Sequence, residues 1–188
     1  MNTTKPSYVF FVPGLEGGIG RITTLLALGM QAEGKKVEVW SASKASGYAF
    51  ELQQKVKVRY IGKGSVRSSI FSLSRALKKY SPTSLISASY QANCVAIFVS
   101  IFTKTKTNFA IADHPSLDSA LKEFSLIKRT MWMFLIFILY RFADKHIAVS
   151  KGVANAMSKF GRIKMSNISI LPNPVITDKI FTDASVKI

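Results

Sequence analysis

The stretch that decides the fold is Tyr8-Val-Phe-Phe-Val-Pro-Gly-Leu-Glu-Gly-Gly-Ile-Gly-Arg21. It begins with a short apolar run, Tyr8–Val12, which predicts a buried strand. Four glycines follow within residues 13–20 and predict a tight turn, and residues 21–33 have the apolar spacing of a helix that Gly34 ends. A strand, a glycine-rich turn and a helix in this order predict the first unit of a parallel α/β sheet.

The same alternation continues along the rest of the chain. We predict further strands at residues 36–40, 56–61, 84–88, 108–112, 146–149 and 168–171, and helices at 66–80, 92–102, 117–142 (one long or broken helix) and 151–160. Residues 41–52 read as a loop. The pattern predicts an α/β fold with a single Rossmann-like, doubly wound, mostly parallel sheet and helices on both faces. We assign residues 1–175 to this domain and residues 176–188 to the start of a linker or tail.

Composition limits the classes of function. The chain has 188 residues, of which 48% are hydrophobic, so it can bury a core. One cysteine excludes a disulfide framework and indicates a reducing compartment, and two histidines leave little for a metal site, so we expect a cytoplasmic protein without a metal. With 26 Lys and Arg against 10 Asp and Glu, the net charge is +16, which indicates a nucleic acid, an anionic membrane surface or a phosphorylated ligand as partner.

The glycine-rich turn is a candidate phosphate site. Gly17, Gly18, Ile19 and Gly20 lie where a helix begins, and free N–H groups at a helix start attract anions. Arg21 lies in the first turn of the predicted helix, where a cation interacts unfavourably with the positive end of the helix dipole. An arginine at this position therefore favours a nearby anionic ligand. The spacing is not G-x-G-x-x-G, so a dinucleotide site is weakly supported, and a tight turn without a ligand is the alternative.

Three stretches together resemble the N-terminal domain of family 4 glycosyltransferases, which have the two-domain GT-B fold. The first is Val12–Ile22, with its glycine-glycine-x-x-Arg loop, and the second is Ala110-Ile-Ala-Asp-His-Pro115. The third is Ala143-Asp-Lys-His-Ile-Ala-Val-Ser-Lys-Gly-Val153, followed by Ile168-Ser-Ile-Leu-Pro-Asn-Pro-Val175. Their order and spacing carry the resemblance, which extends from Tyr8 to Val175.

The resemblance implies a retaining transfer of sugar from a nucleotide-sugar donor, which is a substrate and not a cofactor. It also implies that this domain mainly holds the acceptor, that the glycine loop faces the donor, and that His114 contacts the donor sugar. Asp113 is a second polar contact or a loop anchor. Tyr90 and Asn93 are acceptor contacts by position only. We interpret His146 as a strand-edge residue and Cys94 as part of the core.

Such enzymes need a second domain that binds the nucleotide. Because the sequence reaches residue 188 shortly after Pro172-Asn-Pro-Val175, we expect that this chain alone does not catalyse transfer. It then depends on a missing donor-binding domain, or is one subunit of a split enzyme.

The basic residues are concentrated between residues 55 and 79, where there are eight and no acidic residue. Arg67, Phe71, Arg75 and Lys78 share one predicted helix face, a pattern typical of a membrane surface. An ordinary solvated face is the alternative, and residues 124–142 could be core or membrane-facing. No nucleic-acid-binding motif is present, so nucleic acid is the disfavoured partner. We therefore expect a peripheral protein on the inner face of the cell membrane, with a lipid-linked or cell-surface glycan acceptor.

Overall fold

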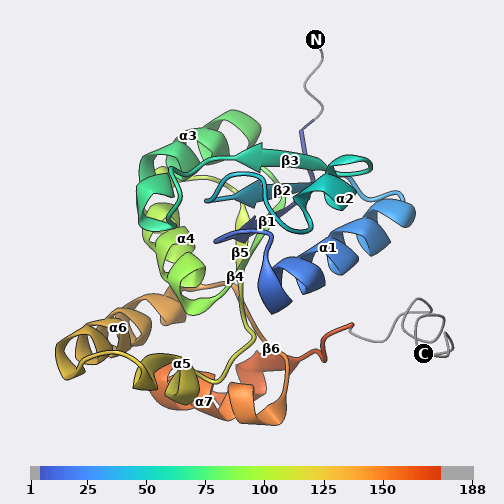
Figure 1. The fold of residues 1–188 in the computed structure, drawn as a ribbon. Coiled ribbons are helices and arrows are strands. Elements are labelled where there is room, and N and C mark those ends of the chain that lie inside the picture. The colour runs from blue at the N-terminus through green and yellow to red at the C-terminus, as the bar shows by residue number, and fades with distance from the viewer. Residues whose placement is uncertain (1–4, 175–188) are drawn as a thin grey trace, which may run out of the picture.

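Seven parallel strands form one sheet in the order β3-β2-β1-β4-β5-β6-β7 in the computed structural model, which describes residues 5–174 (Figure 1). The strands are β1 (Tyr8–Val12), β2 (Val37–Ser41), β3 (Lys57–Tyr60), β4 (Ser84–Ala88), β5 (Asn108–Asp113), β6 (Lys145–Ala148) and β7 (Ile168–Ile170). Each strand lies within two residues of its predicted bounds. Parallel strands covered on both faces read as continuous apolar runs, which is why the sequence identifies them well.

Helices cover both faces of the sheet, so the predicted doubly wound Rossmann-like fold is confirmed. On one face, α1 (Gly17–Ala32) and α2 (Ala49–Gln53) pack over Phe10 and Val12. Val9 and Phe11 belong to the core on the other face, which four larger helices cover: α3 (Ile70–Tyr80), α4 (Tyr90–Thr103), α6 (Leu126–Leu139) and α7 (Lys151–Gly161). In Figure 1, α3, α4 and α6 line the left side of the molecule and α1 and α2 the right.

Three predicted elements differ from the structure. Helix α1 begins at Gly17 and not at Arg21, because the low helix propensity of its glycines hides the first turn. The predicted loop 41–52 contains the start of α2, whose Ala49 and Leu52 are fully buried, so tertiary packing stabilises a helix with a weak local signal. The predicted helix 66–80 begins with a 3-10 turn, Arg67–Ser69.

The segment 117–142 is broken, one of the two alternatives that the sequence allowed. Helix α5 (Leu117–Lys122) ends before the extended Ser125, and α6 is followed by a 3-10 turn, Tyr140–Phe142. One face of α6 belongs to the core, since Trp132, Ile136 and Leu139 are buried. The other face is exposed, with Leu126, Ile127, Met131 and Phe134 at its surface. Within residues 5–174, no helix combines the length and apolar character needed to cross a membrane.

The positions of Cys94 and His146 can be compared with the predictions from the sequence. Cys94 is buried, as predicted. His146 is not at an edge: it lies on β6, between β5 and β7, and its Nε2 is 2.9 Å from the carbonyl oxygen of Tyr140. Packing against the 3-10 turn that follows α6 buries this side chain.

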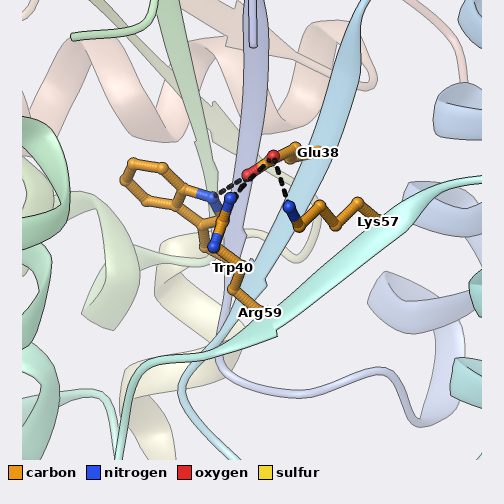
Figure 2. Close-up of polar contacts among 4 residues, drawn as sticks. All are labelled: Glu38, Trp40, Lys57 and Arg59. Carbon is orange, nitrogen blue, oxygen red and sulfur yellow. Dashed lines mark hydrogen bonds and ion pairs between the residues drawn. The ribbon is translucent and has the colours of Figure 1, made fainter. Parts of the chain in front are cut away.

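A buried acidic side chain of β2 bridges to the neighbouring strand β3. Glu38 is buried and accepts a bidentate pair of hydrogen bonds from Arg59, at 2.6 and 3.0 Å, and one from the Trp40 indole at 3.0 Å (Figure 2). Lys57 approaches it to 4.0 Å, and the Arg59 guanidinium also stacks on Tyr80. Buried carboxylates need such partners, so this cluster explains how Glu38 is accommodated on the fully buried strand β2, beside the partly exposed edge strand β3.

Candidate functional site

The order of the strands creates a crevice at one edge of the sheet. From β1 the chain continues into α1 on one face, and from the neighbouring β4 it continues into α4 on the other. The two connections diverge at the carboxyl ends of these strands, which is where ligands bind in folds of this kind. A cavity of about 720 Å³ lies there, and its wall includes Pro13, Gln91, Lys128 and Trp132.

The cavity wall comes from segments far apart in the sequence. Pro13 follows β1, residues 64–67 follow β3, Gln91 lies in the first turn of α4, and Lys128 and Trp132 come from α6. Of the predicted site residues, only Arg67 lines this cavity. The glycine loop and His114 lie at the same carboxyl edge of the sheet but outside its wall.

The glycine loop presents backbone N–H groups at the start of α1. The first residues of a helix have no intrahelical acceptor for their N–H groups, which here applies to Gly17, Gly18 and Ile19. Glu16 occupies the capping position without a side-chain hydrogen bond to the helix, and the Gly20 N–H already donates to the Glu16 carbonyl at 3.1 Å. The arrangement suits an anion at the end of the helix dipole.

The three glycines are present for different reasons. Gly17 has a φ of +61°, which favours glycine. At Gly20 a Cβ would lie 2.3 Å from the Leu15 carbonyl carbon, so the close packing of two backbone segments excludes any side chain. Gly18 has neither constraint, because a Cβ there meets open space. The fold does not require glycine at position 18, which leaves the surface above it free for a ligand.

Arg21 lies one turn into α1 and is exposed. Within residues 5–174, no carboxylate lies within 4.0 Å of its guanidinium. The side chain is therefore available to a ligand at the carboxyl edge of the sheet.

His114 follows β5 directly and is half-buried. Its Nδ1 is 3.2 Å from Oδ1 of Asn173. This contact connects two of the stretches that resemble the glycosyltransferase family, the one ending at Pro115 and the one that contains Asn173. Burial lowers the pKa of His114, and the bond to Asn173 opposes that effect only in part. The imidazole is thus neutral near pH 7, with Nδ1 held by Asn173, and within residues 5–174 Nε2 has no hydrogen-bond partner.

Asp113 belongs to a buried hydrogen-bonded network beneath the site. Its carboxyl group accepts from the Tyr140 hydroxyl at 3.0 Å and from the Asn93 amide at 2.9 Å, and Ser87 donates to the Asn93 oxygen at 2.7 Å. Burial is the main cause that raises the pKa of Asp113 to about 7, while these two donors act in the opposite direction. Of the two roles predicted for Asp113, this geometry favours the loop anchor.

The two residues predicted as acceptor contacts both point away from open surface. Asn93 is fully buried in the network of Asp113, and Tyr90 is buried with its ring edge-to-face against Trp132, 5.1 Å between centroids. Neither residue lines the cavity; both lie behind its wall. Ser89, just before them, has a φ of +94° and caps α4 through its side chain, a strained geometry at the crevice.

Phe71, Arg75 and Lys78 are exposed on α3, as their spacing predicts, and Phe71 is 79% exposed. Arg67 is placed differently, because it lies in the preceding 3-10 turn with its guanidinium 5.4 Å from the centre of the Trp132 ring.

Lys128, Trp132 and Asn173 are among the site residues that sequence reasoning missed. Asn173 lay inside a quoted stretch, and its Pro-Asn-Pro context was a usable signal. No local sequence signal places Lys128 and Trp132 at the cavity, because they reach it only through the packing of α6 against α4.

The comparison with known families decides the identity of this fold. The family model described as Glycosyltransferase Family 4 matches residues 16–179. The chain belongs to glycosyltransferase family 4. The resemblance found in the three stretches is confirmed. No curated protein sequence matches the chain significantly.

Solved structures agree with the family on the fold. The apo form of the lipopolysaccharide outer core galactosyltransferase WaaB has a TM-score of 0.68 at 18% identity, over 89% of this chain and 46% of that one. Anabaena Alr3699/HepE in complex with UDP has a TM-score of 0.66 at 15% identity, over 89% of this chain and 44% of that one. A glycosyltransferase from Rickettsia africae ESF-5 has a TM-score of 0.65 at 15% identity, over 97% of this chain and 46% of that one. This family 4 chain thus spans about half the length of these structures.

The different roles of the glycines predict different effects of alanine. Gly20→Ala should lower the free energy of unfolding by about 1–3 kcal/mol, because its Cβ overlaps the Leu15 backbone. Gly18→Ala and the control Gly29→Ala, which lies later in α1 and also faces open space, should leave stability unchanged or raise it by up to about 1 kcal/mol. Urea denaturation measures all three. If Gly18→Ala costs as much as Gly20→Ala, the fold itself requires the glycine.

The raised pKa of Asp113 predicts a pH-dependent contribution to stability. Its pKa is about 7 when folded and near 3.8 when unfolded, so the stabilising effect of the neutral carboxyl is complete below pH 4 and is lost as the pH rises through 7. From pH 5 to 7 the wild type should lose up to about 1 kcal/mol per pH unit relative to Asp113→Asn. The lowered pKa of His114 acts in the opposite direction, but it cancels in this comparison. A difference between the two proteins that does not change with pH would contradict the assignment.

Proposed function

We propose that this chain is the acceptor-binding half of a retaining glycosyltransferase that moves a sugar from a nucleotide-sugar to a lipid-linked or cell-surface glycan. The observation that supports the proposal is that the candidate residues and the cavity lie at the same carboxyl edge of the sheet. There the glycine loop, Arg21 and His114 lie beside a cavity of about 720 Å³ at the point where the strand order reverses. The family match of residues 16–179 supports the reaction class.

The chemistry of the edge suits such a transfer. A departing nucleoside diphosphate needs N–H donors and a cation, which Gly17, Gly18, Ile19 and Arg21 would supply at the start of α1. A sugar with oxocarbenium-like character needs a fixed polar neighbour, and the neutral His114, held by Asn173, would supply one. No cofactor enters this proposal. Structures of HepE were solved with UDP and with UDP and glucose, which supports a nucleotide-sugar as the donor.

The donor-binding half is proposed to come from a second domain or from a separate subunit. This chain spans 46% of WaaB and 44% of HepE, so the matched structures contain a further half that could meet the glycine loop across a cleft. In this proposal neither half is active alone.

We also propose that the protein is cytoplasmic and binds the inner face of the cell membrane through the exposed face of α3. Phe71 projects into solvent there, and Arg75 and Lys78 are exposed beside it. Each cation near an anionic leaflet contributes about 1 kcal/mol, so a few of them give reversible binding. This location would bring the domain to a lipid-linked acceptor.

The proposed role of the edge predicts which variants lose transfer. The assay joins this chain to the donor-binding half of a structurally similar glycosyltransferase such as WaaB and follows radiolabelled sugar from UDP-sugars into a lipid extract. His114→Ala should lower the rate about a hundredfold or more, and Gly18→Ala at least about tenfold, because both face the donor. Gly29→Ala is the matched control and should have no effect. Transfer by the 188-residue chain alone, or a rate insensitive to His114→Ala, would contradict the proposal.

The proposed membrane face predicts lipid-dependent sedimentation. The chain should bind vesicles that contain anionic lipid and not neutral ones, and 0.5 M salt should weaken the binding. Replacing Arg75 and Lys78 by Gln should lower the partition coefficient about 30-fold, since two cations contribute about 2 kcal/mol. The same vesicles should bind Phe50→Glu normally, because Phe50 is exposed on α2 across the sheet. Tight, salt-sensitive DNA binding without a lipid preference would favour the nucleic-acid alternative instead.

A further inference from the structure

An apolar groove adjoins the cavity on the side of α3, α4 and α6. It has a volume of about 210 Å³, and its wall is formed by side chains such as Ile70, Val95, Phe98, Leu135 and Leu139. Apart from the Arg67 guanidinium, the wall offers only hydrocarbon, aromatic rings and sulfur to an occupant. Helices α3, α4 and α6 lie on the left side of the molecule in Figure 1.

The groove and the cavity adjoin each other. Arg67, Met131 and Trp132 line both of them, so the two spaces share this part of their walls. Phe98 lines the groove and not the cavity, and it is 42% exposed, so the groove opens to solvent beside α4. A single elongated ligand can therefore extend from the carboxyl edge of the sheet, past Trp132, to the outer surface of α4 and α6.

The two compartments differ in chemical character. The cavity contains the cations Arg67 and Lys128 together with Ser65 and Gln91, and no carboxylate lines it among residues 5–174. Arg67 stands at the junction, where its guanidinium is 5.4 Å from the centre of the Trp132 ring. This packing holds one cation where a ligand would pass from the polar compartment to the apolar one.

We propose that the cavity and the groove form one site for an anionic amphiphile, whose phosphate lies at Arg67 and Lys128 and whose hydrocarbon tail lies between α3, α4 and α6. The inference rests on the proposed acceptor role of this domain and names the chemical class of the acceptor: a lipid phosphate, with a glycan or other head group. Charge complementarity at the cavity, and its continuity with an apolar groove that opens to the surface, favour this occupant over a free sugar or a helix of another protein.

The test measures binding of monoacylglycerol phosphates with C8, C10 and C12 chains to the 188-residue chain, below their micellar concentrations. The fluorescence of Trp132 is the signal, since the other tryptophan, Trp40, is fully buried away from the groove. Affinity should rise by about two- to fourfold per added CH₂, which reflects about 0.8 kcal/mol per buried methylene. Glycerol 3-phosphate, which has no tail, and an uncharged C12 monoacylglycerol should each bind at least about tenfold more weakly than the C12 phosphate.

Three variants locate the ligand. Phe98→Glu places a charge in the groove and should abolish the dependence on chain length, while the same change at Phe50, exposed on the opposite face of the sheet, should have no effect. Arg67→Gln should weaken binding of the phosphate about tenfold and leave the uncharged analogue unaffected. The chain-length series uses the unmodified protein, so its result stands even if a variant folds poorly.

Three results would each overturn the inference: an affinity independent of chain length, equal affinity for the uncharged analogue, or equal effects of Phe98→Glu and Phe50→Glu. None of these measurements uses a sugar donor. Failure to bind amphiphiles together with transfer to a water-soluble glycan would reject this inference and keep the proposed function. Amphiphile binding with no transfer by any donor-completed form would reject the proposed function and keep the site.

Discussion

The placement of β1 between β2 and β4 is the constraint on which the rest of this structure depends. Connections between parallel strands are right-handed, so a chain that moves from β1 to β2 in one direction, and from β4 to β5 in the other, must place α1 and α4 on opposite faces. The two connections therefore separate at the carboxyl edge, and no single helix can fill the space between them. The cavity, the glycine loop and the end of β5 all lie along this edge because of that reversal.

A buried polar network holds the walls of the crevice in place. Ser87 at the end of β4, Asn93 in α4, Asp113 at the end of β5 and Tyr140 after α6 form a chain of hydrogen bonds of 2.7–3.1 Å. Their interior position means that an unpaired member would cost free energy, so the four elements are fixed relative to one another. Trp132 and Tyr90 pack edge-to-face beside this network, and α6, which Tyr140 follows directly, supplies Lys128 to the cavity. The network thus connects the stability of the sheet to the shape of the proposed acceptor site.

Much of the fold could be predicted from the sequence, because strands buried on both faces leave continuous apolar runs that local reasoning detects. The order of three short stretches was enough to identify the family. The start of α1 and the presence of α2 could not be predicted. Glycines hide the first turn of α1, and α2 is stabilised by the burial of Ala49 and Leu52.

The direction in which a side chain points could not be predicted from the sequence either. Asn93 occupies the predicted edge, yet its amide turns inward to Asp113, a contact between residues twenty positions apart. Lys128 and Trp132 reach the cavity only after α6 has packed on α4.

The central claim is that the crevice between the ends of β1 and β4 is the acceptor site of a family 4 glycosyltransferase domain. A crystal structure of the chain with a C12 monoacylglycerol phosphate tests it most directly. The account predicts density for the phosphate between Arg67 and Lys128, and for the tail beside Trp132 and Phe98. Density for the ligand elsewhere on the molecule, with the cavity holding only water, would contradict it.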